Sequence, residues 1–148
     1  MPLVAHNDLP TFERLRKRGH NILTLEEARQ QDSRELHIGL LNMMPDAALT
    51  ATEQQFMGLV GSSNLSSRLY VYPFSIPELN RDEQTEEHIE KYYFEFENLA
   101  EWGLDALIIT GANVVTPLLD QEPIWTPLIA VEFRSGSMPR ITTYRPSP

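Results

Sequence analysis

The 148-residue sequence contains no cysteine and has fewer basic than acidic side chains. Without cysteine the chain can form neither a disulfide scaffold nor a thiolate metal site, and it has no cysteine nucleophile of its own. Twelve lysines and arginines stand against 21 aspartates and glutamates, which gives a formal charge of −9. Because contacts to phosphates require cationic side chains, we expect no nucleic-acid partner.

Long apolar runs are missing as well. The longest apolar stretch, residues 104–115, is interrupted by Asp105, Thr110, Gly111 and Asn113. A membrane-spanning helix needs about 20 apolar residues in succession. The first 20 residues contain no continuous apolar region of the kind that a secretory signal requires. We therefore expect an intracellular, cytoplasmic protein with no membrane partner.

The charge is unevenly distributed along the chain. Residues 134–148 hold three arginines, three prolines and no acid, so nine of the 12 basic residues face 21 acids in residues 1–133. Proline prevents regular helix, and this segment has no apolar periodicity. We predict a helical extension over residues 1–35, a partial α/β domain over 36–133, and an appended, disordered tail over 134–148.

Nearly continuous apolar segments predict three buried strands, over residues 36–44, 68–74 and 104–109. Such runs are typical of strands that are covered on both faces of a parallel sheet. Apolar residues at helical spacing predict helices between and after these strands, over residues 50–61, 82–101 and 122–133, and two short helices begin near Thr11 and Thr24. The alternation of strands and helices predicts an α/β fold with a parallel sheet and flanking helices.

Capping signals set the expected helix boundaries. Thr50 and Glu53 match a capping box, in which the threonine oxygen accepts from an amide and the glutamate reaches back. Thr24 and Glu27 form the same pattern. Gly103 is a typical stop for the helix over 82–101.

Two loops follow the carboxyl ends of predicted strands, at residues 42–46 and 110–113. Ligands of open α/β sheets bind at this edge, and Gly111 lets main-chain amides approach a developing oxyanion. The alternative interpretation is an ordinary strand-to-helix turn. Neither loop matches a dinucleotide or phosphate-binding motif. The four histidines have no metal-ligand spacing, so we expect no metal, and we assign His37 and His88 to surface or packing roles.

Four stretches, in the same order, resemble the homoserine O-acyltransferases of methionine biosynthesis, the homoserine O-succinyltransferase family. They are residues 34–45, residues 46–56 together with 122–125, residues 88–96, and residues 103–112. The resemblance extends from near the amino terminus to about Val131.

The resemblance implies a fold similar to that of class I glutamine amidotransferases, which is flavodoxin-like. It implies transfer of an acyl group from succinyl-CoA or acetyl-CoA to L-homoserine, with acyl-CoA as co-substrate and no separate cofactor. In the family a cysteine thiolate takes the acyl group and a His–Glu pair assists. The motif positions imply substrate-binding or oxyanion roles for Asn42, Met44, Pro45, Thr110, Gly111 and Ala112. Val115 corresponds to the donor-specificity position, where the absence of a carboxylate favours a succinyl donor.

The sequence departs from the family pattern in three respects. The cysteine nucleophile and the His–Glu pair have no counterpart, so no catalytic residue is present. The resemblance ends at Glu132-Phe133, about halfway through the family's length, and a shifted reading frame or a truncated gene would produce such a tail. Many members carry a lysine soon after the Met-Pro pair, and here Asp46, Ala47 and Ala48 follow instead. We predict no turnover by this chain alone.

Two alternatives from other classes stay open. The first is a non-catalytic α/β binding or dimerisation module, which pairs with a full-length homologue or forms a homodimer through an unpaired sheet edge or the amino-terminal helices. The second is a small flavodoxin-like ligand binder, for which the sequence offers no phosphate-binding loop.

Overall fold

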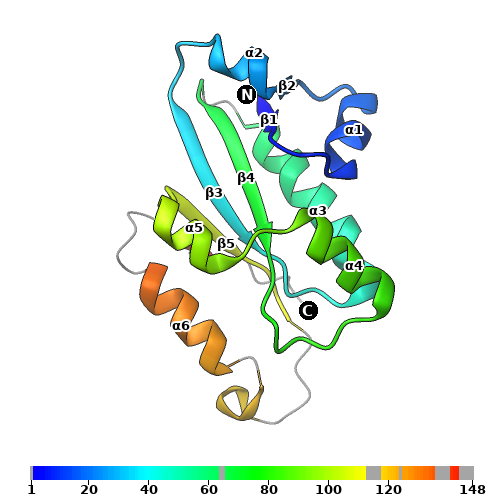
Figure 1. The fold of residues 1–148 in the computed structure, drawn as a ribbon, viewed down its shortest axis with the longest axis vertical. Helices are drawn as coiled ribbons and strands as arrows, with labels where there is room; N and C mark the ends of the chain where they lie inside the picture. Colours follow the sequence, from blue (N-terminus) through cyan, green and yellow to red (C-terminus); the bar gives the residue numbers. More distant parts are fainter. Residues whose placement is uncertain (1, 64–65, 113–117, 124, 136–140, 144–148) are drawn as a thin grey trace.

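The structure, a computed structural model, describes residues 2–63, 66–112, 118–123, 125–135 and 141–143. These residues form a parallel sheet of six strands in the order β2-β1-β4-β3-β5-β6 (Figure 1). The strands are β1 (Leu3–Ala5), β2 (Ile22–Thr24), β3 (Glu35–Leu41), β4 (Arg68–Phe74), β5 (Ala106–Ile109) and β6 (Ile141–Thr143). The helices are α1 (Pro10–Lys17), α2 (Leu25–Arg29), α3 (Asp46–Gly61), α4 (Glu83–Tyr92), α5 (Phe96–Trp102) and α6 (Trp125–Ser135), with a 3₁₀ turn at Leu119–Gln121. The predicted α/β class with a parallel sheet is confirmed.

Helices cover both faces of the sheet. In Figure 1, α1, α3 and α4 lie to one side of the central strands, and α5 and α6 lie to the other. On the first face, Phe12 of α1 and Met57 of α3 pack with Leu40 of β3. On the second, Leu99 of α5 packs with Leu107 of β5. Burial on both faces is the reason that β3 and β4 have almost unbroken apolar sequences.

The sheet is wider than the three predicted strands. Segment 1–35 contains both expected short helices, but also β1 and β2, which pair with each other, and Leu3 of β1 pairs with Leu69 of β4. The segment is therefore part of the sheet rather than only a helical extension. Strands of three residues are too short to show a periodicity of two in the sequence.

The carboxyl-terminal segment also contributes to the described structure. Helix α6 continues to Ser135, and Ile141–Thr143 forms β6 beside β5. The other residues of the predicted disordered tail, 136–140 and 144–148, lie outside the described residues.

Three predicted helices have other boundaries in the structure. The helix predicted over residues 122–133 is α6, which extends from Trp125 to Ser135. Helix α3 begins at Asp46 after the N-cap Pro45, four positions before the predicted start, so the capping box at Thr50 and Glu53 is not formed. The early start is favoured by Asp46 at the positive end of the helix dipole and by two alanines after it. In contrast, the capping box of Thr24 is present, since its hydroxyl accepts from the amide of Glu27 at 3.1 Å.

The helix predicted over residues 82–101 is divided into α4 and α5. Between them the main chain is extended, and the amide of Phe94 donates to the carbonyl of Pro73 at 2.9 Å. This bridge to the end of β4 replaces the intrahelical hydrogen bond of Phe94. Helix α5 ends at Gly103 as predicted, with a φ of +85° that favours glycine.

Candidate functional site

The candidate site lies where the chain direction across the sheet reverses. From β3 the chain passes through α3 to β4 on one side, whereas β6 lies on the other side of β5. The carboxyl ends of the adjacent strands β3 and β5 therefore border a topological switch point, the usual ligand position in such sheets. The predicted loops, residues 42–46 and 110–113, both begin there, although Asp46 is the first residue of α3 and Asn113 lies outside the described residues.

Thr110 joins the two loops. Its hydroxyl oxygen accepts from the amide of Met43 at 2.8 Å, and its own amide donates to the carbonyl of Leu41 at 3.0 Å. The hydroxyl proton is directed to the carbonyl of Gly111 at 3.0 Å. Because Thr110 is only 3% exposed, its side chain holds the loops at a fixed separation rather than presenting a group to a ligand.

Asn42 is fully buried and supports its own loop. Its side-chain amide donates to the carbonyl of Leu49 at 3.0 Å and to the hydroxyl of Tyr93 at 3.2 Å. Its side-chain oxygen accepts from the amide of Met44 at 3.3 Å. Both amide protons are thus used within the protein, which makes Asn42 a support of the loop in this structure.

The accessible part of the site consists of the remaining predicted residues. Met44, Gly111 and Ala112 are partly exposed and Pro45 is exposed. Val115, the predicted determinant of the acyl donor, lies outside the described residues.

Arg81 is a site residue that the sequence reasoning did not identify. It lies between β4 and α4, and its guanidinium donates to the carbonyls of Asn42, at 3.2 Å, and of Met44. It also pairs with Asp46 at 3.2 Å, and its side chain is 5% exposed. Its signal in the sequence is that it is one of only two cations among the acids of residues 78–101.

Arg81 supplies a buried cation to the loop after β3, whose own residues 42–46 include no lysine or arginine. Asp46, which occupies the position after the Met-Pro pair, accepts both from Arg81 and from the amide of Asp82 at 2.8 Å. Asp46 therefore anchors the start of α3 to the segment before α4. The two charges largely compensate each other, so that the loop carries little net charge.

Glu53 was predicted to be a capping residue, but the structure gives it another role. It is fully buried, and its partners are Thr11, His88 and Tyr93. Burial, together with the carboxylate of Glu53, raises the pKa of the Tyr93 hydroxyl, which therefore stays protonated. Glu53 is four residues from both Leu49 and Met57, so helical spacing places it on the apolar side of α3, and this is the signal that could have identified it.

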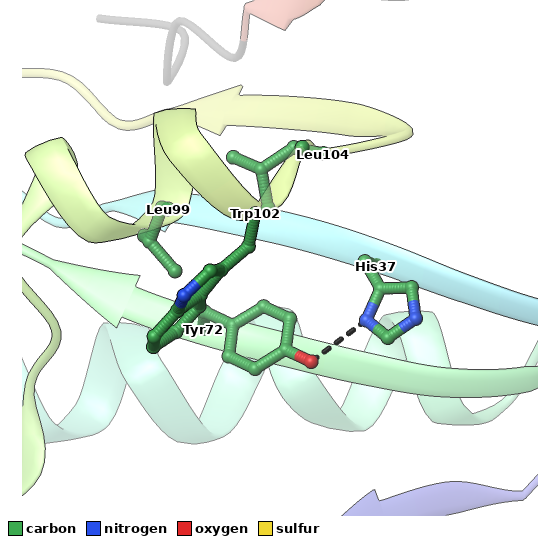
Figure 2. Close-up of a pocket in the computed structure, with 6 residues that line it drawn as sticks. His37, Tyr72, Leu99, Trp102 and Leu104 are labelled. Atoms are coloured by element: carbon green, nitrogen blue, oxygen red, sulfur yellow. Dashed lines mark hydrogen bonds between the residues drawn. The ribbon is translucent and has the colours of Figure 1, made fainter.

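A separate pocket lies near the amino ends of β3 and β5 (Figure 2). It has a volume of about 210 Å³ and is lined by His37, Tyr72, Leu99, Trp102, Gly103 and Leu104. The Tyr72 hydroxyl and Nδ1 of His37 are 2.7 Å apart and share a hydrogen bond, and burial raises the pKa of Tyr72, so the phenol keeps its proton. None of the predicted site residues lines this pocket.

The described residues contain neither a candidate metal centre nor a candidate membrane span. In that part of the chain, no group of three or more histidine, aspartate or glutamate side chains is arranged to hold a metal ion. Among the same residues, no helix has the length and apolar character needed to cross a membrane.

Comparisons with known proteins agree with the motifs at the two loops. The family model described as homoserine O-succinyltransferase matches residues 2–135. A homoserine O-succinyltransferase of Allochromatium vinosum is 60% identical over 131 residues, which are 88% of this chain and 37% of the relative. One of Methylobacter tundripaludum is 57% identical over 133 residues, or 90% and 38% of the two chains. The chain spans less than two fifths of the length of these relatives, and it belongs to the homoserine O-succinyltransferase family.

Proposed function

We propose that this chain provides the substrate-binding loops of a homoserine O-acyltransferase in methionine biosynthesis, with succinyl-CoA as donor and L-homoserine as acceptor. The observation that carries the proposal is the meeting of two family motifs at the switch point, where the Met43 amide and the Thr110 hydroxyl are 2.8 Å apart. Acyl-CoA is the co-substrate, and the chemistry needs no further cofactor. A biosynthetic role of this kind favours the cytoplasm.

The loops suit stabilisation of charge on an acyl oxygen. Attack on a thioester carbonyl places negative charge on that oxygen, and fixed main-chain amides stabilise it at little reorganisation cost. We assign this role to the amides of Gly111 and Ala112, because the Thr110 side chain is used to hold the loops together. We also assign substrate contacts to Met44 and Pro45, which are the accessible residues of the loop after β3.

Turnover needs a group that these 148 residues lack. A thioester intermediate requires a sulfur nucleophile, and the chain has no cysteine. We therefore propose that the chain by itself binds acyl-CoA without transferring the acyl group. For donor choice, an uncharged Val115 does not repel the succinyl carboxylate, which favours succinyl-CoA over acetyl-CoA.

Titration calorimetry with succinyl-CoA, acetyl-CoA and L-homoserine tests the proposal. We expect saturable binding of succinyl-CoA that is tighter than that of acetyl-CoA, and no release of free CoA thiol when both substrates are present. Gly111→Val should weaken binding, whereas Trp102→Ala, at the separate pocket, should not. Absence of binding by the wild-type chain would refute the proposed function, and thiol release would refute the absence of turnover.

A non-catalytic dimerisation module is the second candidate. The observation that favours it is the exposure of large apolar side chains, since Leu59 is 64%, Trp102 is 62% and Leu118 is 56% exposed. Sedimentation velocity at micromolar concentration should then show a homodimer, and a monomer would exclude this candidate.

A further inference from the structure

The buried carboxylate of Glu53 is not explained by the proposed acyl transfer. It lies on α3 with 0% exposure, in line with Leu49 and Met57. Removing a carboxylate from water is costly unless hydrogen bonds replace its hydration. The partners of Glu53 should therefore indicate what its burial achieves.

Three donors from other segments surround Glu53. The Tyr93 hydroxyl, just after α4, donates to Oε2 at 2.7 Å, and Nε2 of His88 on α4 lies 3.1 Å from the same oxygen. The hydroxyl of Thr11 on α1 donates to Oε1. The carboxylate thus joins α1, α3 and α4 at one buried point.

The Tyr93 hydroxyl transmits this arrangement to the loop after β3. The Tyr93 hydroxyl has a single proton, and it donates this proton to Oε2 of Glu53. The same oxygen must then accept from the Asn42 side-chain amide, which is 3.2 Å away. Together with the Leu49 carbonyl, which accepts from the same nitrogen, the hydrogen bond from Tyr93 to Glu53 therefore holds the amide nitrogen of Asn42 toward Tyr93.

The orientation of Asn42 in turn determines the partner of the next loop amide. With its nitrogen toward Tyr93 and Leu49, the side-chain oxygen of Asn42 faces the amide of Met44 at 3.3 Å. In the flipped orientation the Met44 amide would face a second donor and lose its acceptor.

We infer that Glu53 is a positioning residue for the loop over residues 42–45, and that it acts through Tyr93 and Asn42 without contacting substrate. We call these residues, with Thr11 and His88, the Glu53 network. The network determines the direction of the Met44 amide at the accessible edge of the switch point. The functional meaning of this positioning rests on the proposed function, but the positioning itself does not.

Amide hydrogen exchange, measured by NMR on the full chain, tests the inference directly. Tyr93→Phe keeps the ring and removes the hydroxyl, so the exchange of Met44 should accelerate about fivefold, the equivalent of one neutral hydrogen bond. The amide of Met43, which is bonded to Thr110, should keep its rate. Thr110→Val should produce the reverse pattern, with faster exchange at Met43 and not at Met44.

Tyr92→Phe is the matched control. Tyr92 is adjacent and partly buried, and the described structure shows no hydrogen bond of its hydroxyl. It should leave both amides unchanged. Equal acceleration of Met43 and Met44 in Tyr93→Phe, or an unchanged Met44, would overturn the inference, since the first indicates general loosening and the second an independent loop.

A second variant and ligand binding separate this inference from the proposed function. Glu53→Gln should also accelerate hydrogen exchange selectively at the Met44 amide. The glutamine NH2 group would be a hydrogen-bond donor that faces the donors of Thr11, His88 and Tyr93. If exchange at the Met44 amide accelerates in both variants but the wild-type chain does not bind succinyl-CoA, the positioning role of Glu53 stands and the proposed function fails. If succinyl-CoA binds equally well to wild type and Tyr93→Phe, with Met44 unchanged, the inference fails and the proposed function stands.

Discussion

Two clusters in this protein contain the same three residue types, a glutamate, a histidine and a tyrosine, and differ in burial. In the Glu53 network the carboxylate is 0% exposed and the His88 side chain 19%. In the second cluster, which we call the His37 cluster, His37 lies between Glu35 and Tyr72, and the Glu35 and His37 side chains are 43% and 33% exposed. The first joins three helical segments and the second lies on two adjacent strands.

The difference shows how burial changes the effect of one hydrogen bond. At the His37 cluster, water can replace a lost partner, so a broken contact costs little. In the Glu53 network a lost partner leaves a buried polar group unsatisfied, which costs the full desolvation of that group. The buried cluster can therefore hold a loop in one arrangement, whereas the exposed one borders an open pocket.

The largest effect on the free energy of unfolding is expected from Glu53→Gln. The glutamine amide would face the hydroxyl or imidazole donors that the carboxylate now accepts from, so the free energy of unfolding should fall by about 3 kcal/mol. Urea denaturation followed by circular dichroism measures it. A loss no larger than that of Glu35→Gln would remove the proposed difference between the clusters.

A smaller loss of stability is expected from Gly39→Ala on β3, close to the pocket of the His37 cluster. The added Cβ would lie 2.7 Å from Cδ1 of Leu104, which lines that pocket. Overpacking of this kind should reduce the free energy of unfolding by about 2 kcal/mol.

Gly58→Ala on α3 is the control for this substitution. There the nearest contact of the added carbon, with Leu15, is an ordinary 3.5 Å. Because alanine favours helix, this variant should be more stable by about 1 kcal/mol. Thermal melts of both variants would contradict the packing argument if the two changes had the same sign.

The pH dependence of stability provides a finer comparison through His6, whose ring lies 4.9 Å from that of Tyr72. Burial lowers the pKa of His6 and outweighs the hydrogen bond to the carbonyl of Val71, which acts in the opposite direction. The unfolded chain therefore binds a proton below its pKa of 6.5 that the folded chain does not, so stability falls as the pH falls below that value. His6→Gln should show a flatter profile between about pH 7 and 5 in urea titrations, and identical profiles would contradict the assignment.

The smallest effect is expected from Glu35→Gln. Arg68, its partner at 3.2 Å, keeps hydrogen bonds to Ser33 and to the carbonyl of Ala28. An exposed carboxylate adds little to such a site, so the free energy of unfolding should change by less than about 1 kcal/mol. A larger loss in the same urea assay would mean that the exposed cluster is as tightly coupled as the buried one.

The elements that local sequence defines well were predicted well. Strand β4 covers residues 68–74 as expected, because an apolar run with a proline-containing loop after it has few alternatives. The cap at Thr24 and the stop at Gly103 were also correct, since each depends on neighbouring residues only. The two candidate loops were placed correctly at the ends of their strands.

What could not be predicted depends on contacts between distant segments. Strand β1 pairs with β4 through Leu3 and Leu69, which are far apart in the sequence, and no local pattern indicates this pairing. The break at Phe94 depends on the carbonyl of Pro73. Glu53 was read as a capping residue because its pattern with Thr50 is local, whereas its donors lie up to 42 residues away in sequence.

The position of β1 in the sheet has a consequence for the order of folding during synthesis. β1 is the first strand in chain order among the described residues, yet it is an interior strand, with β2 on one side and β4 on the other. As the ribosome extends the chain, β1 and β2 can associate early, but the second edge of β1 stays open until residues 68–74 have emerged. A nascent chain that stalls before this point exposes that edge to other chains, so slow translation between β2 and β4 should increase aggregation.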